Sequence, residues 1–143
     1  MRRWVPALLL PLMLPLMATL ALAQSPTEEA RTLIAGYHKD VAWLDRARDL
    51  MEQHLKTDSQ VDGMILLSRI YFAWGDVRAK DDEEKLAAYD RGRQVGKRAV
   101  ELAPKNPDAH FWYAANTGRW GTTKGVFRSL FLLPTLREEI DTI

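Results

Sequence analysis

The 143-residue chain contains no cysteine, and this absence excludes several kinds of chemistry at once. Disulfide bridges, thiolate zinc sites and cysteine nucleophiles all require a sulfhydryl group. The chain also lacks an excess of charge of either sign, because 20 Lys and Arg residues stand against 19 Asp and Glu residues. Proteins that bind the nucleic-acid backbone carry a surplus of basic residues. The charge balance therefore argues against a nucleic-acid partner.

Catalytic and metal-binding motifs are missing as well. The chain has no G-x-S-x-G, phosphate-binding loop or G-x-G-x-x-G pattern. None of His38, His54 and His110 has a second histidine four residues away, as a helical zinc motif requires. The acidic run 81–84 lacks the alternating ligands and central glycine of a calcium loop, and it suits the start of a helix. We predict a non-enzymatic protein without catalytic residues, metal or cofactor.

Sustained alternation of apolar and polar residues is absent, so no stretch predicts a β-strand. Helix signals recur instead. Ser25, Pro26 and Glu28 form a helix start, and apolar residues from 41 to 55 recur three or four positions apart. Ser59 is expected to start a helix that stops at Gly75. Further helices are expected at 83–103, 107–118 and 126–132 and from 134 onward, with 119–124 as a turn. The predicted fold class is all-α.

The first 23 residues have the pattern of a secretory signal. A short basic head is followed by an uncharged apolar stretch that ends in Ala-Leu-Ala. We expect cleavage after Ala23, which leaves residues 24–143 as one domain with a periplasmic or secreted location. The alternative is an uncleaved membrane anchor, since residues 4–27 carry no charge and are long enough to span a bilayer. Three prolines and the small-residue site favour removal.

A repeat signal surrounds residues 99–109, AVELAPKNPDA, which resemble the junction between two tetratricopeptide repeats. In this frame Gly92 and Gly96 face the partner helix. The four first-helix positions of two successive repeats then hold Met64, Leu67, Ser68 and Tyr71, and His110, Tyr113, Ala114 and Thr117. Their spacing of 46 residues (Met64 to His110) exceeds the usual 34. We expect the extra residues between the two helices of the repeat, around 76–85.

Two strings narrow this resemblance to a family. Residues 107–121, PDAHFWYAANTGRWG, and 125–140, GVFRSLFLLPTLREEI, resemble a bacterial tetratricopeptide-like family that is related to the helical domain of the regulator of microtubule dynamics proteins. The likeness spans roughly residues 60–143. It implies antiparallel helix pairs stacked as an α-solenoid with no enzymatic step, whereas a microtubule role does not carry over to an exported bacterial chain. The last helix reaches Ile143 without a polar cap, so we expect a C-terminally incomplete repeat array.

The inner face of a helix-pair stack is built from first-helix residues, and this rule selects a candidate binding surface. One repeat contributes Asp62, Ile65, Arg69 and Phe72, and the next contributes Asp108, Phe111 and Ala115. Arginine and aromatic side chains on a concave surface suit an extended peptide or a helix end. We therefore predict an exported scaffold that binds a protein or peptide partner.

Two other functions stay open at the level of sequence. A solute-binding accessory protein of a transporter would need an enclosed apolar pocket and a stable oligomer. A membrane-tethered adaptor would retain residues 1–23, and only then would the protein contact a membrane. Homo-oligomerisation is compatible with each of these functions.

Overall fold

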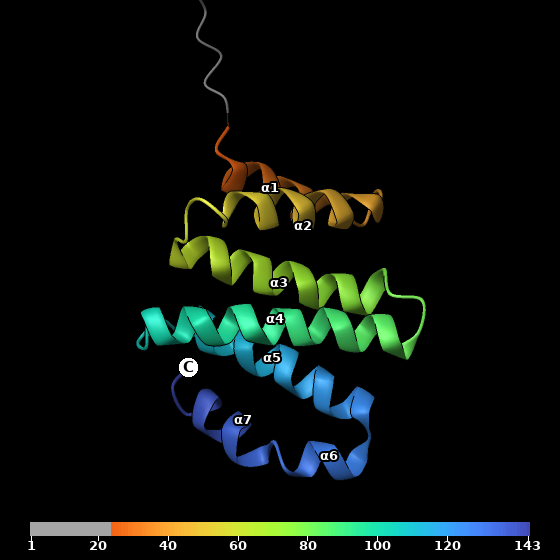
Figure 1. Cartoon of the computed structure of the whole chain (residues 1–143), viewed down its shortest axis with the longest axis vertical. Coiled ribbons are helices and arrows are strands. Elements are labelled where there is room, and N and C mark those ends of the chain that lie inside the picture. The colour runs from red at the N-terminus through yellow and green to blue at the C-terminus, as the bar shows by residue number, and fades with distance from the viewer. Residues whose placement is uncertain (1–23) are drawn as a thin grey trace, which may run out of the picture.

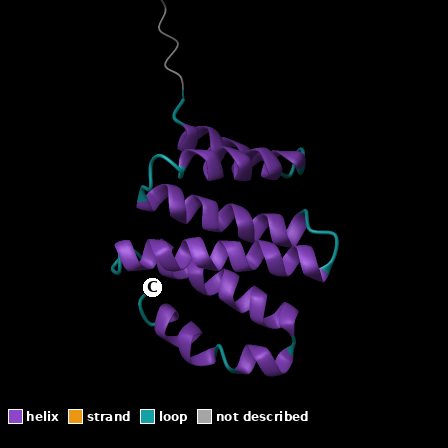
Figure 2. Ribbon diagram, in the orientation of Figure 1, coloured by secondary structure: helices purple, strands orange, loops and turns teal. Residues whose placement is uncertain are grey.

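The structure is a computed structural model that describes residues 24–143. Within this range every regular element is an α-helix, which confirms the predicted all-α class (Figures 1 and 2). The predicted signal segment lies outside the described residues. No helix between residues 24 and 143 is long and apolar enough to cross a membrane. The helices are α1 (Pro26–Gly36), α2 (Ala42–His54), α3 (Val61–Val77), α4 (Asp82–Leu102), α5 (Pro107–Lys124), α6 (Val126–Leu130) and α7 (Leu133–Ile140).

The helices lie in successive layers along the long axis, from α1 and α2 at one end to α6 and α7 at the other (Figure 1). Short connections make α1 and α2, α3 and α4, and α4 and α5 antiparallel neighbours. In addition, α3 contacts both α1 and α5, and α3 and α5 run in the same direction (Figure 1). The N-terminal ends of α3 and α5 therefore lie at the same side of the molecule.

Side-chain caps set several helix starts. The Ser25 hydroxyl accepts a hydrogen bond from the Glu28 amide at 3.2 Å, as predicted. Asp81 caps α4 by accepting from the Glu84 amide at 2.9 Å, so the acidic run opens a helix, where its charge is favourable. The start predicted at Ser59 is wrong, because its hydroxyl turns back toward the Leu55 carbonyl and Gln60 is the N-cap of α3.

The predicted extra segment, residues 76–85, is helical apart from a four-residue connection between α3 and α4. Helix α3 continues past Gly75 to Val77, and only residues 78–81 connect it to α4. Tertiary contacts explain why α3 continues past Gly75. Asp76 accepts a hydrogen bond from the Tyr89 hydroxyl of α4 at 2.6 Å and pairs with Arg119 of α5 at 2.8 Å. Six of the ten extra residues thus lengthen the two helices, and the other four form the connection.

The turn predicted at residues 119–124 is also helical, and α5 ends only at Gly125. The Arg119 guanidinium stacks over the Phe72 ring at 5.6 Å in addition to pairing with Asp76 of α3. These contacts hold the last turns of α5 against α3. Gly125 then ends the helix with φ of 116°, a left-handed conformation that glycine adopts without steric cost.

Close approach of α3, α4 and α5 depends on small and polar residues. Asn116 donates to the Ser68 carbonyl at 3.0 Å and to the Trp112 carbonyl at 2.9 Å, and the Ser68 hydroxyl donates to the Gly92 carbonyl at 2.8 Å. A Cβ atom on Gly92 would lie 2.5 Å from the Asn116 Cγ, and one on Gly96 would lie 2.9 Å from the α5 backbone. The prediction that both glycines face a partner helix is confirmed.

Candidate functional site

Five of the seven predicted surface residues line one hollow between α3 and α5. We call this hollow of about 540 Å³ the polar hollow. Helix α1 and the N-cap residue of α5 also contribute to its lining. Its lining consists of Arg31, Asp62, Ile65, Leu66, Arg69, Asn106, Asp108, Phe111 and Trp112. The structure thus brings together residues that are more than forty positions apart in the sequence.

The remaining two predicted residues, Phe72 and Ala115, lie in a second hollow of about 430 Å³ between α3, α5 and α7. We call it the apolar hollow, and Phe111 belongs to both hollows. Its other lining residues are Ala114, Gly118, Arg119, Thr122, Leu136, Ile140 and Ile143. The predicted surface is therefore two adjoining hollows with a shared aromatic wall.

Helical spacing explains how short stretches of sequence supply these walls. Residues three, four or seven positions apart on a helix lie on the same face. Asp62, Ile65 and Arg69 form one such stripe on α3, and Asp108 and Phe111 begin another on α5. Because α3 and α5 run in the same direction, the acidic ends of both stripes lie at one end of the hollow (Figure 1).

Trp112 is the centre of an aromatic cluster beside the polar hollow. Its ring meets Phe111 edge-on at a centroid distance of 4.9 Å and Phe72 at 5.7 Å. The Arg69 guanidinium lies over the same ring, 5.7 Å from its centroid. Trp112 is not among the seven predicted surface residues, although its position four residues after Asp108 on the α5 stripe points to it. The cluster fixes the aromatic wall and holds the arginine above it.

A buried histidine attaches α7 to α5. His110 Nδ1 lies 2.5 Å from Glu139 Oε2, and its Nε2 donates to the Pro104 carbonyl at 2.9 Å. Burial favours the neutral ring, but the hydrogen bonds to Pro104 and Glu139 and the nearby negative charge outweigh it and raise the pKa of His110 above its ordinary value. The pair positions α7, which supplies Leu136 and Ile140 to the apolar hollow.

Metal ligation has no geometric basis in the part of the chain that the structure describes. Between residues 24 and 143 no group of three or more His, Asp or Glu side chains lies close enough to hold an ion. The two hollows offer three arginines, two aspartates and an aromatic wall for non-covalent contacts. Such a set of groups can recognise charge and apolar surface.

Fold and surface together define an all-helical protein of packed antiparallel helices with hollows along one face. The chain belongs to the family described as regulator of microtubule dynamics protein 1-3, whose family model matches residues 27–141. The match covers nearly all of the described residues and includes every lining residue of the two hollows except Ile143. No curated protein and no solved structure matches the chain.

Proposed function

We propose that this protein is a non-catalytic exported scaffold that binds a protein or peptide partner on the face formed by α1, α3 and α5. The observation that carries the proposal is the polar hollow, in which residues predicted from two repeats meet. Its volume of about 540 Å³ lies in the range of ligand-binding clefts, roughly 300–1,000 Å³.

The arrangement of the two hollows favours an extended partner. Phe111 is shared between them and is 46% exposed, so its ring is available to a partner that reaches from one hollow into the other. Burial of a half-exposed aromatic side chain is a common source of binding energy at protein interfaces. A small apolar solute would instead be expected in an enclosed apolar cavity, whereas the polar hollow is lined by four charged residues.

The helix arrangement supports a tetratricopeptide-like solenoid as the scaffold. Contacts of α3 with α1 and α5 suit the first helices of successive pairs, which line the inner face in such a stack. The signal pattern of residues 1–23 supports export. A bacterial origin and a periplasmic location are parts of the same proposal.

Peptide selection from a random display library against the purified protein tests this function. We expect the selected peptides to bind about tenfold more weakly to Phe111→Ala, since the loss of one central aromatic contact costs about 1.4 kcal/mol. Leu102→Ala is a matched control, because Leu102 is 45% exposed on α4 and lines none of these hollows. Failure to select any peptide, or equal loss in both variants, would contradict the proposal.

A further inference from the structure

Arginine stacking is frequent in this structure, and one stacked arginine differs from the others. In three stacks the guanidinium also pairs with a carboxylate at 2.7–2.8 Å. These are Arg48 over Trp74 with Asp49, Arg93 over Trp120 with Asp90, and Arg119 over Phe72 with Asp76. Arg69 over Trp112 has no carboxylate within ion-pair distance among residues 24–143. Its guanidinium is exposed and held in place by the ring.

Two aspartates of the same hollow also lack a basic partner within the described range. Asp62 and Asp108 lie in the first turns of α3 and α5, and both are exposed. Asp62 precedes Arg69 by seven residues, which is a rise of about 10 Å along the helix. No ion pair joins these two residues in the structure, where the Arg69 guanidinium lies over the Trp112 ring. The polar hollow therefore presents the unpaired cation of Arg69 toward one end and two unpaired anions toward the other, while its second arginine, Arg31, pairs with Glu28 of α1 at 3.4 Å.

We infer that the polar hollow recognises an extended peptide that carries an acidic and a basic side chain about three residues apart. The acidic group binds Arg69, and the basic group binds Asp62 and Asp108. This inference rests on the proposed function and names the chemistry of its partner. In a polyproline II conformation residues i and i+3 lie on the same face, about 9 Å apart, which matches the spacing of the charges. Between them, Phe111 and Trp112 offer an apolar wall to an intervening side chain.

The free charges set specificity more than affinity. Each exposed ion pair is worth up to about fivefold in binding, so removing one weakens the complex modestly. Reversing a charge replaces attraction by repulsion and has a larger effect, about tenfold. Binding also weakens as salt is added, because exposed charges are screened over about 10 Å at 0.1 M ionic strength.

A panel of synthetic peptides tests the spacing directly. We would titrate the protein with capped decapeptides of Ala, Ser and one Leu, each with one Asp and one Lys at separations of one to six residues in both orders. Changes in the NMR signals of the Trp112 indole and the Arg69 guanidinium report binding at the hollow. We expect the tightest binding at a separation of three, in one order only, with loss of affinity between 50 and 300 mM salt.

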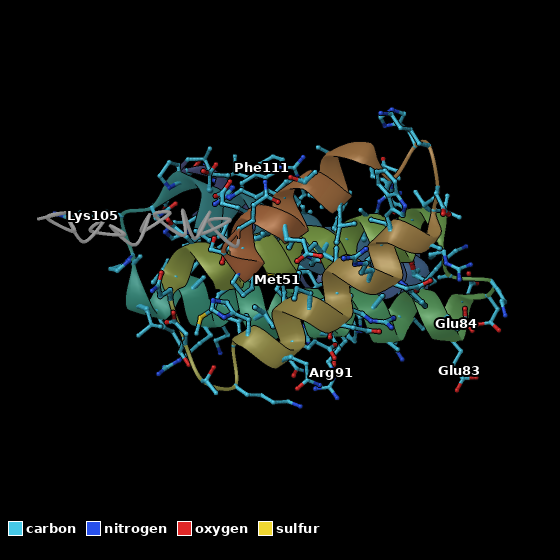
Figure 3. All side chains as sticks on the ribbon, turned by 90° about the horizontal axis from the view of Figure 1, so that it is seen from above. Met51, Glu83, Glu84, Arg91, Lys105 and Phe111 are labelled. Carbon is cyan, nitrogen blue, oxygen red and sulfur yellow. The ribbon has the colours of Figure 1, made fainter. Side chains whose placement is uncertain are left out.

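Charge-reversal variants test the assignment of each group. Arg69→Glu is expected to weaken the best peptide about tenfold and to bind more tightly the peptide in which Lys replaces its Asp. Arg91→Glu is a matched control, because Arg91 lies on α4 on the side opposite Phe111 (Figure 3). Equal effects of the two variants, or no dependence on the Asp–Lys separation, would overturn the inference and leave Phe111-dependent peptide binding intact. Loss of Phe111-dependent binding to every peptide would overturn the proposed function as well.

Discussion

Single glycines decide how closely the central helices approach. Gly92 and Gly96 lie on the face of α4 that contacts α3 and α5, and the space for a Cβ atom is filled by Asn116, Ser68 and Tyr113. Asn116 is fully buried, and its amide donates to backbone carbonyls of both α3 and α5. A side chain at Gly92 would displace this amide, so the glycine and the asparagine depend on each other.

Two glycine substitutions separate packing from helix propensity. Gly92→Ala is expected to lower the free energy of unfolding by about 1–3 kcal/mol, the usual cost of overpacking. Gly118→Ala is the control, because its new Cβ would meet only Leu136 at 4.0 Å. That change is expected to raise the free energy of unfolding by up to about 1 kcal/mol, since alanine is the better helix former. Urea unfolding followed by circular dichroism measures both, and destabilisation of equal size would contradict the packing argument.

Pairs of elements are held by a few buried or half-buried polar contacts. Asp45 of α2 accepts hydrogen bonds from Trp74 Nε1 at 2.6 Å and Arg78 Nε at 2.9 Å, so it fastens α2 to the end of α3. Partial burial acts to raise the pKa of Asp45, but the hydrogen bonds from Trp74 and Arg78 and the arginine charges outweigh this effect and lower it. The contact is therefore strongest when the carboxylate is ionised.

The pH dependence of Asp45→Asn follows from that lowered pKa. A carboxyl group with a lowered pKa stabilises the fold above its unfolded pKa, about 3.9, and loses this contribution as pH falls toward the folded value. At pH 7 we expect Asp45→Asn to lower the free energy of unfolding by about 1–2 kcal/mol. The difference from wild type should shrink between pH 5 and pH 2. Asp49→Asn on the exposed face of α2 is the control, and it should change the free energy of unfolding little at any pH in this range.

The attachment of α7 has the opposite pH dependence. The raised pKa of His110 means that its contacts stabilise the fold fully below the unfolded pKa, about 6.5, and that this contribution is lost as pH rises through the folded value. The stability advantage of wild type over His110→Gln should therefore decrease above pH 6.5. Urea unfolding at pH 6 and pH 9 measures it, and an NMR titration of His110 should give a midpoint above 6.5. A midpoint below 6.5 would show that burial outweighs Glu139.

The whole molecule exposes apolar surface unevenly. Phe127 is 84% exposed and Phe131 is 80% exposed, and they lie four residues apart on α6 and its C-cap. Leu130 and Leu133, which flank Phe131 in the sequence, are each 54% exposed as well. Large apolar side chains exposed close together in this way promote association in water.

Self-association at this end is a testable consequence. We expect the mean mass in sedimentation experiments to rise with protein concentration, and Phe127→Ser combined with Phe131→Ser to reduce this rise because it removes the two most exposed rings. Leu102→Ser, at the end of α4, should leave the association unchanged. A protein that stays monomeric at all concentrations would contradict the expectation.

Much of the architecture could be predicted from the sequence, because helix caps, small residues and apolar stripes are local signals. The caps at Ser25 and Asn106, the close glycines of α4 and the buried stripe of α3 depend on residues a few positions apart. The extents of α3 and α5 could not be predicted in this way. Asp76 and Arg119 look like loop residues in isolation, yet their ion pair holds two helix ends together across 43 sequence positions.

The candidate surface was likewise predictable only in part. Helical periodicity determined which side chains share a face of each helix, and the resemblance to tetratricopeptide repeats predicted that the two faces meet, as they do for Asp62, Ile65, Arg69, Asp108 and Phe111. Three features appeared only in three dimensions. Phe72 and Ala115 lie in a separate hollow, Arg31 contributes to the polar hollow, and Arg69 lies apart from every described carboxylate. Those features depend on which helices lie side by side, and packing between distant segments decides that.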